Sequence, residues 1–152
     1  EMPDPVAGDG QVVVDIKATG ISFPDVLIVQ GLYQFKPPFP FSPGSEIAGI
    51  VSSVGDGISK FKKGDRVMGN VGSGGLVERG AFFESQLMPL PETMDFKIAA
   101  GFPLNYGTTI HGLKQRAELK PNETILISIS PVSNFLFIVL CFISIITNMS
   151  WY

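Results

Sequence analysis

The chain has 152 residues, which is enough for one domain with a hydrophobic core of its own. Its 17 glycines and 12 prolines favour short strands and tight turns over a helical bundle. The formal net charge of −3 argues against nucleic acid or an anionic membrane as the main partner, since both select basic surfaces. The single cysteine, Cys141, excludes an internal disulfide.

Charge is confined to the first part of the sequence. The 11 basic and 14 acidic residues all lie between Glu1 and Glu123, and no glycine follows Gly112. The sequence opens with acidic residues and prolines, without the features of a signal peptide, and is typical of an internal segment. We therefore interpret residues 124–152 separately from the rest.

The first third of the chain predicts a strand, a short helix and an extended loop. Residues 11–19 alternate apolar and polar side chains after Val13, which indicates a strand with one wet face. Residues 24–31 predict a helix, with Pro24 in the first turn and Gly31 as the stop. Residues 34–43 contain four prolines and must form an extended loop.

The middle of the chain predicts further short strands. Residues 47–54 are a second apolar strand, and residues 81–87 are another. Turn sequences separate them at Gly55-Asp56-Gly57 and Lys62-Lys63-Gly64-Asp65. Strands at this spacing are typical of a barrel or a sandwich.

The pattern changes after Pro91. Residues 95–100 and 104–119 predict helices, because Ile110, Leu113 and Ala117 share one face of the second segment. Residues 124–128 then begin a strand that looks buried.

The sequence offers few residues for chemistry. The only histidine is His111, so a zinc site lacks the three or four ligands it needs. No serine lies in a nucleophile elbow, and the glycines at 55–57 and 72–75 lack the context of a dinucleotide loop. Such a loop would follow residues 124–128, where the chain reads Ile129-Ser130-Pro131-Val132-Ser133-Asn134 without glycine.

Several short blocks nevertheless follow one another in a specific order and spacing. They are Gly20-Ile21-Ser22-Phe23-Pro24-Asp25, Gln30-Gly31-Leu32-Tyr33, Pro43-Gly44-Ser45-Glu46-Ile47-Ala48-Gly49, Phe61-Lys62-Lys63-Gly64-Asp65-Arg66-Val67, Leu90-Pro91 and Tyr106-Gly107-Thr108-Thr109. Between roughly Asp4 and Ile127 the chain resembles the N-terminal, GroES-like domain of the medium-chain dehydrogenase/reductase superfamily, in its zinc-independent quinone oxidoreductase (zeta-crystallin-like) branch. The zinc-containing alcohol dehydrogenases of that superfamily have a cysteine and a histidine where this chain has Ser22 and Ser45.

The resemblance implies a mostly β fold with some α: a GroES-like, partly open barrel, truncated, followed by helices and the first strand of an incomplete Rossmann domain. We expect a GroES-like domain at residues 1–102, a linking helix and the start of the Rossmann domain at 103–128, and an atypical apolar tail at 129–152. The family's first strand, of about 20 residues, and its last barrel segment have no counterpart here.

The resemblance also implies NADPH-dependent reduction of a quinone or enone, without zinc, in an enzyme that is often a homodimer. Tyr33, Thr109 and Ser22 match cofactor-binding positions, while no catalytic residue is indicated. Structural interpretations compete: barrel packing for Tyr33, helix back-bonding for Thr109 and a turn for Ser22. Asp25 is interpreted as a first-turn acid of the helix or a clamp on the backbone, and Glu46 as an inner structural acid.

Without a phosphate-binding loop, we expect an inactive fragment of such an oxidoreductase, in the cytoplasm. The alternative is a non-catalytic domain that binds a partner or is anchored to a membrane by its tail. Residues 135–152 are uncharged, and as a helix they would span about 27 Å. A frame shift or retained intron, a membrane anchor, and a segment packed on the domain or on a partner all remain open for this tail.

Overall fold

The computed structural model describes residues 3–128 and 142–146. The chain divides into two compact units, Glu1–Asn105 and Tyr106–Tyr152, which are described in turn.

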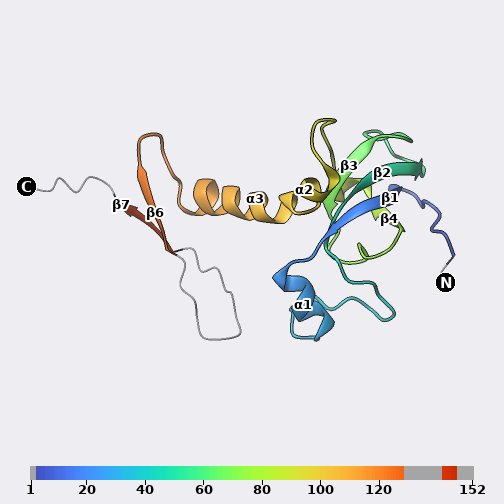
Figure 1. The fold of residues 1–152 in the computed structure, drawn as a ribbon, viewed down its shortest axis with the longest axis horizontal. Coiled ribbons are helices and arrows are strands. Elements are labelled where there is room, and N and C mark those ends of the chain that lie inside the picture. The colour runs from blue at the N-terminus through green and yellow to red at the C-terminus, as the bar shows by residue number, and fades with distance from the viewer. Residues whose placement is uncertain (1–2, 129–141, 147–152) are drawn as a thin grey trace, which may run out of the picture. The chain divides into compact units, whose positions relative to one another are not determined.

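The first unit is built on one antiparallel sheet of five strands (Figure 1). The strands are β1 (Gln11–Gly20), β2 (Glu46–Val54), β3 (Arg66–Asn70), β4 (Arg79–Phe83) and β5 (Leu87–Pro89). Their order across the sheet is β4-β1-β2-β3-β5, so β4 and β5 are edges that do not pair with each other in the described chain. The mostly β, partly open barrel that the sequence predicts is confirmed.

The core of this unit lies on the curved inner face of the sheet. Val12, Val14, Ile47, Val51 and Val67 are buried there with their neighbours. The alternation predicted after Val13 is confirmed, because Val14 and Ile16 contact this core while Lys17 is exposed. Val13 is buried as well, and the β1–β2 register shifts between Val13 and Val14, which is the mark of a bulge.

A turn interrupts the strand predicted at residues 81–87. β4 ends at Phe83, a single 3₁₀ turn covers Glu84–Gln86, and β5 follows. The side chain of Gln86 accepts the Phe83 N–H, and the Glu84 carboxylate accepts the N–H groups of Ser59 and Lys60. The prediction of one strand was wrong because these side chains bond to backbone and reverse the chain.

Two helices follow the sheet: α2 (Phe96–Ala100) and α3 (Phe102–Ile110). Asp95 caps α2 by accepting the Lys97 N–H at 2.8 Å. Arg66 of β3 holds the preceding turn, because its guanidinium donates to the carbonyls of Glu92 and Met94 and lies 4.5 Å from the centre of the Phe96 ring. Ala99 and Ala100 pack with Ala48, Met68 and Leu90 as a second small core.

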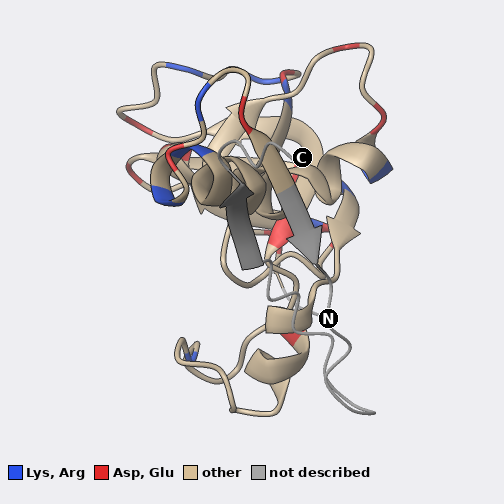
Figure 2. Ribbon diagram, turned by 90° about the vertical axis from the view of Figure 1, so that its left-hand side faces the viewer, with Lys and Arg blue, Asp and Glu red and all other residues tan. Residues whose placement is uncertain are grey.

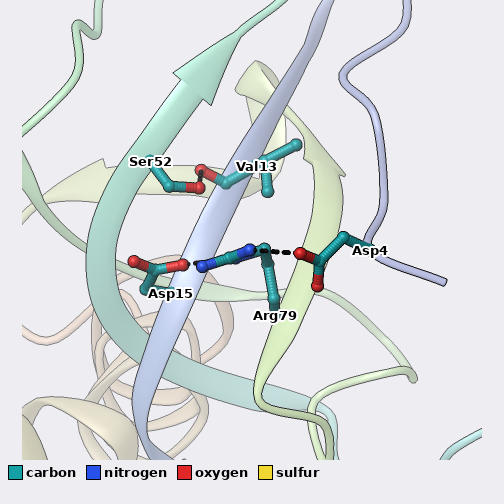
Figure 3. A network of polar contacts seen from close by, with 5 residues as sticks. All are labelled: Asp4, Val13, Asp15, Ser52 and Arg79. Atoms are coloured by element: carbon teal, nitrogen blue, oxygen red, sulfur yellow. Dashed lines mark hydrogen bonds and ion pairs between the residues drawn. The ribbon is translucent and has the colours of Figure 1, made fainter. Parts of the chain in front are cut away.

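The N-terminal segment is tied to the sheet by charge (Figure 3). The Arg79 guanidinium bonds to Asp15 of β1 at 2.6 Å and to Asp4 at 2.7 Å. Both carboxylates raise the pKa of Arg79, mainly through the hydrogen bond and the charge of Asp15. The Ser52 hydroxyl of β2 also donates to the Val13 carbonyl of β1.

The second unit contains the end of α3, a π-helical segment at His111–Arg116, and two strands. The helix predicted at residues 104–119 therefore begins two residues earlier and changes type at His111. The strand predicted at residues 124–128 is confirmed as β6 (Thr124–Ser128), and it pairs antiparallel with β7 (Phe142–Ile146).

The apolar tail was predicted as a possible helix over residues 135–152. That alternative is wrong for residues 142–146, which form β7, in keeping with the β-branched Ile143, Ile145 and Ile146. Residues 129–141 and 147–152 lie outside the described chain. Within the described residues, no helix combines the length and the apolar character needed to span a membrane.

Candidate functional site

The site lies at the connection between β1 and the helix that follows it. β1 ends at Gly20, and α1 (Phe23–Val29) begins three residues later, with Ser22 as its N-cap. Asp25 is the third residue of this helix and is buried. Its Oδ2 accepts the backbone N–H of Ser22 and the Ser22 hydroxyl, each at 2.8 Å. This carboxylate fixes the first turn of α1, and its negative charge interacts favourably with the positive end of the helix dipole.

A third donor reaches the same oxygen from a distant part of the sequence. The chain returns from α1 to the start of β2, and the Ser45 hydroxyl donates to Asp25 Oδ2 at 3.2 Å. Ser45 is buried. Ser22 and Ser45 thus donate to the same carboxylate oxygen. These are the two positions at which the resemblance places a cysteine and a histidine in the zinc-containing enzymes.

Glu46 lies next to this group. Its side chain is 2% exposed, and its Oε1 accepts the N–H of Leu104 in the first turn of α3 at 2.7 Å. Burial raises the pKa of Glu46, and the nearby charge of Asp25 raises it further, while the Leu104 N–H acts in the opposite direction. In the described chain no basic side chain forms an ion pair with either acid.

The donor set of this group does not suit zinc. Two serine hydroxyls and two carboxylates take the place of the thiolates and imidazoles that zinc prefers. No group of three His, Cys, Asp or Glu side chains in the described residues could hold a metal ion.

Ser22 can offer only part of what an amide side chain would. Its hydroxyl hydrogen is given to Asp25, so toward a ligand the oxygen can act only as an acceptor. An asparagine side chain at this position could donate as well. Ser22 therefore has the structural role expected for it, as the residue that begins the first turn of α1.

The other two predicted cofactor positions lie outside this hydrogen-bonded group. Tyr33 is half-buried on the chain that follows α1, just after Gly31 ends the helix with a positive φ of 70°. Thr109 is exposed on α3 and belongs to the second unit.

Two residues prove more central than the sequence reasoning made them. Asp25 and Glu46 were interpreted as structural acids, and the structure makes them the centre of the polar group. The Ser22-x-x-Asp25 spacing is a capping signature that could have pointed to the first contact. No sequence signal could have paired Glu46 with Leu104, 58 residues away.

Comparison with known proteins agrees with this geometry. Residues 8–92 match the model of the alcohol dehydrogenase GroES-like domain. This chain belongs to that family. It falls in the quinone oxidoreductase branch of the medium-chain dehydrogenase/reductase superfamily, as predicted.

Three relatives illustrate the likeness. Quinone oxidoreductase-like protein 2 of Rattus norvegicus is 40% identical over 126 residues, which cover 83% of this chain and 36% of that protein. The crystal structure of a probable oxidoreductase from Mycobacterium abscessus has a TM-score of 0.74 at 42% identity, covering 80% of this chain and 39% of that one. The Escherichia coli quinone oxidoreductase complexed with NADPH has a TM-score of 0.71 at 34% identity, covering 81% and 38%.

The chain spans little more than a third of the length of these relatives. What it shares with them is the GroES-like barrel, which includes the Ser22, Asp25, Ser45 and Glu46 group.

The described residues do not fit a whole NADPH molecule. The nicotinamide end has candidate neighbours in Ser22 and Tyr33, but a pyrophosphate needs several backbone N–H groups presented by a glycine-rich turn at a helix start. The sequence after β6 has no glycine from which to build such a turn.

Proposed function

We propose that this chain is the GroES-like portion of an NADPH-dependent quinone or enone oxidoreductase that works without zinc. The observation that carries the proposal is the pair of serines on Asp25. At the positions where zinc enzymes of the superfamily have metal ligands, this chain has hydroxyl groups already engaged in a hydrogen-bonded cap. In this proposal no Lewis acid acts at these positions, and the two hydroxyl groups hold the Asp25 carboxylate instead.

The proposal assigns Ser22, Tyr33 and Thr109 to the nicotinamide end of the cofactor. It also keeps the division into a GroES-like domain at 1–102, a linking segment at 103–128 and a tail at 129–152. The small-molecule partner in this proposal is a quinone or enone, and nucleic acid is not proposed as a partner. The proposal places the protein in the cytoplasm, where thiols stay reduced, and the single cysteine is consistent with that.

On its own the chain is expected to be inactive, because it cannot hold the pyrophosphate. We expect no binding of NADPH tighter than about millimolar, since a few nicotinamide contacts cannot offset the free-energy cost of association. Titration of NADPH fluorescence with the purified chain measures this directly. Binding with a micromolar Kd would contradict the expectation of an inactive fragment.

The barrel itself can be tested in a chimera with a related enzyme. Residues 1–128 of this chain are joined to the part of the E. coli quinone oxidoreductase that lies beyond the matched region. We expect NADPH-dependent reduction of a soluble quinone, unaffected by chelators. A chimera that folds and binds NADPH but turns over no quinone or enone would overturn the proposed function.

A further inference from the structure

The long helix of the second unit changes type at the only histidine of the chain (Figures 1 and 2). α3 ends at Ile110, and His111–Arg116 continue it as a π-helical segment. The Ala117 N–H donates to the Gly112 carbonyl, five residues earlier, at 2.9 Å, which is the bond that defines a π turn. Such turns are rare and are frequent at functional sites. This one begins two residues after Thr109, which the proposed function assigns to the cofactor.

Side chains of this segment form hydrogen bonds that suit the π form. His111 Nδ1 lies 2.6 Å from Gln115 Oε1, and Arg116 Nε donates to His111 Nε2 at 3.3 Å. In an α-helix, residues five apart point about 140° away from each other around the axis, so His111 and Arg116 could not meet. In a π turn the backbone bonds join residues five apart, and their side chains lie one above the other. The bond from Arg116 to His111 therefore favours the π form.

These two contacts require a neutral imidazole. Gln115 Oε1 can only accept, so the hydrogen of the first contact is carried by His111 Nδ1. His111 Nε2 then has a lone pair, which accepts the Arg116 N–H. A second proton on the ring would occupy that lone pair and set two positive groups against each other. Histidine is the side chain whose charge changes between pH 5 and 8, so a change of pH within this range acts on the bond that favours the π form.

The charged groups around His111 do not offset this repulsion. Lys114, the other charged residue of the segment, is also basic. The next acid in the sequence, Glu118, is exposed, and within the described residues neither it nor Arg116 takes part in an ion pair. No other helix or strand of the described chain packs extensively on the segment. All the contacts that decide between the two forms therefore lie within this one turn of helix.

The end of the segment is strained, which narrows the free-energy difference between the π and α forms. Glu118 has a φ of 50°, a left-handed conformation that is unfavourable for a residue with a Cβ. The N–H of Leu119 donates to the carbonyl of Leu113, six residues earlier, which is a wider closure than the end of an α-helix has. An exposed charged contact changes an equilibrium by a few-fold. Between two forms of similar free energy, such a change alters which form is in the majority.

We propose that His111 and Arg116 form a pH-dependent latch on the helix that carries Thr109. With a neutral His111 the segment is π-helical; with a protonated His111 the bond from Arg116 is lost and the segment becomes α-helical. One residue leaves the wide turn in this change, so the chain after Arg116 rotates by about 100° relative to Thr109. The exchange joins two folded forms of the second unit and does not depend on cofactor binding, so it stands or falls separately from the proposed function.

Nuclear magnetic resonance of the full chain between pH 8 and pH 5 tests the latch. The Overhauser contact between the Gly112 α-protons and the Ala117 amide joins residues five apart, so it is strong only in the π form. We expect its intensity to fall by about half over this range, as the ratio of the two forms changes by about fivefold. His111→Gln should keep the contact throughout, because glutamine can accept from Arg116 and does not titrate. Glu46, a buried acid with a raised pKa, is retained in that variant, so its titration is controlled for.

Two further variants separate the latch from a general effect of charge. Arg116→Met removes the donor, so the contact should be weak already at pH 8 and should not change with pH. Lys114→Met removes a basic residue that has no printed role in the latch bonds, and it should behave as the original chain does. A contact that stays constant from pH 8 to pH 5 in the original chain would overturn the proposal. So would an equal fall in His111→Gln, a full contact in Arg116→Met, or a loss of the pH response in Lys114→Met. Circular dichroism shows that each variant is folded.

Discussion

Glu46 combines near-complete burial with a position beside a second buried acid, Asp25. Because its folded pKa is raised, the folded protein holds the Glu46 proton more tightly than the unfolded chain does. Its contribution to stability is fully present below the unfolded pKa of about 4.5 and is lost as the pH rises through the folded pKa. Glu46 is thus a site at which ionisation opposes folding.

Replacing Glu46 by glutamine removes this opposition. Glutamine keeps an oxygen that can accept the Leu104 N–H, and it carries no charge to repel Asp25. We expect Glu46→Gln to unfold at higher denaturant near pH 7 than the original chain, with a flatter dependence on pH above about 4.5. Urea unfolding at a series of pH values measures both.

The control is Glu46→Ala, which removes the acceptor altogether. It should cost about 1–3 kcal/mol, because the Leu104 N–H loses its buried partner. If glutamine proves as damaging as alanine near pH 7, the Glu46 charge stabilises the fold and the interpretation is wrong.

Single residues of the site were predictable only as far as local spacing reached. The contact between Ser22 and Asp25 follows from their separation of three residues at a helix start. The contact of Ser45 with Asp25 depends on where the loop after α1 returns to the sheet, which no local rule gives. The roles of Tyr33 and Thr109 toward the cofactor stay predictions.

At the scale of elements, the pairing of β1 with β2 requires a close approach at Gly49. This glycine lies opposite Ile16, and a Cβ at its position would meet the carbonyl oxygen of Asp15 and a methyl group of Val14. The neighbour is backbone in the middle of a sheet, which cannot turn aside as a side chain can.

Gly49→Ala should therefore destabilise the first unit by about 2 kcal/mol. Gly107→Ala is the matched change, because a Cβ at Gly107 in α3 meets nothing. It should leave stability unchanged or raise it by up to about 1 kcal/mol, since alanine favours helix. Thermal unfolding of both variants gives the comparison, and an equal loss in both would show that the approach at Gly49 is not what matters.

Arg66 ties β3 to the turn before α2 with a geometry that only a guanidinium supplies. Lysine could not donate to the Glu92 and Met94 carbonyls from one planar group while it covers the Phe96 ring. We expect Arg66→Lys to cost about 1–2 kcal/mol in chemical unfolding. Arg116→Lys at an exposed position is the control and should leave the free energy of unfolding unchanged. If Arg66→Lys also leaves it unchanged, the contacts of the Arg66 guanidinium do not stabilise the fold.

The elements themselves were predicted well where side chains alternate or where glycine and proline end a segment. β2 and α1 match their predicted ranges within about one or two residues at each end. β5 was missed because side-chain hydrogen bonds end β4. Gln86 accepts the N–H of Phe83 within the turn, and Glu84 accepts the N–H of Ser59, which lies 25 positions earlier in the sequence. β7 was missed because an uncharged run suits a strand and a helix alike.

At the scale of the whole molecule, the uncharged residues 124–152 contain two strands, β6 and β7, that pair with each other. β6 and β7 form a two-stranded sheet, and two strands alone are marginally stable in water. We expect a chain ending at Glu123, which lacks both strands, to be more soluble than the full chain. The fraction left in the supernatant after expression measures this.

A chain ending at Ser128 is the informative comparison. It keeps β6 but removes its partner, so it should be less soluble than the chain ending at Glu123. If the chain ending at Glu123 aggregates as badly as the full one, the open edges at β4 and β5 are responsible instead.

The strand order also decides how this protein must be made. β1 lies between β2 and β4, although it is synthesised before either. At roughly 5–20 residues per second, β4 leaves the ribosome several seconds after β1. During that time β1, whose Val12, Val13 and Val14 end up fully enclosed, has at least one bare edge. A nascent chain of this protein therefore exposes an unpaired apolar edge of β1 until β4 has been synthesised.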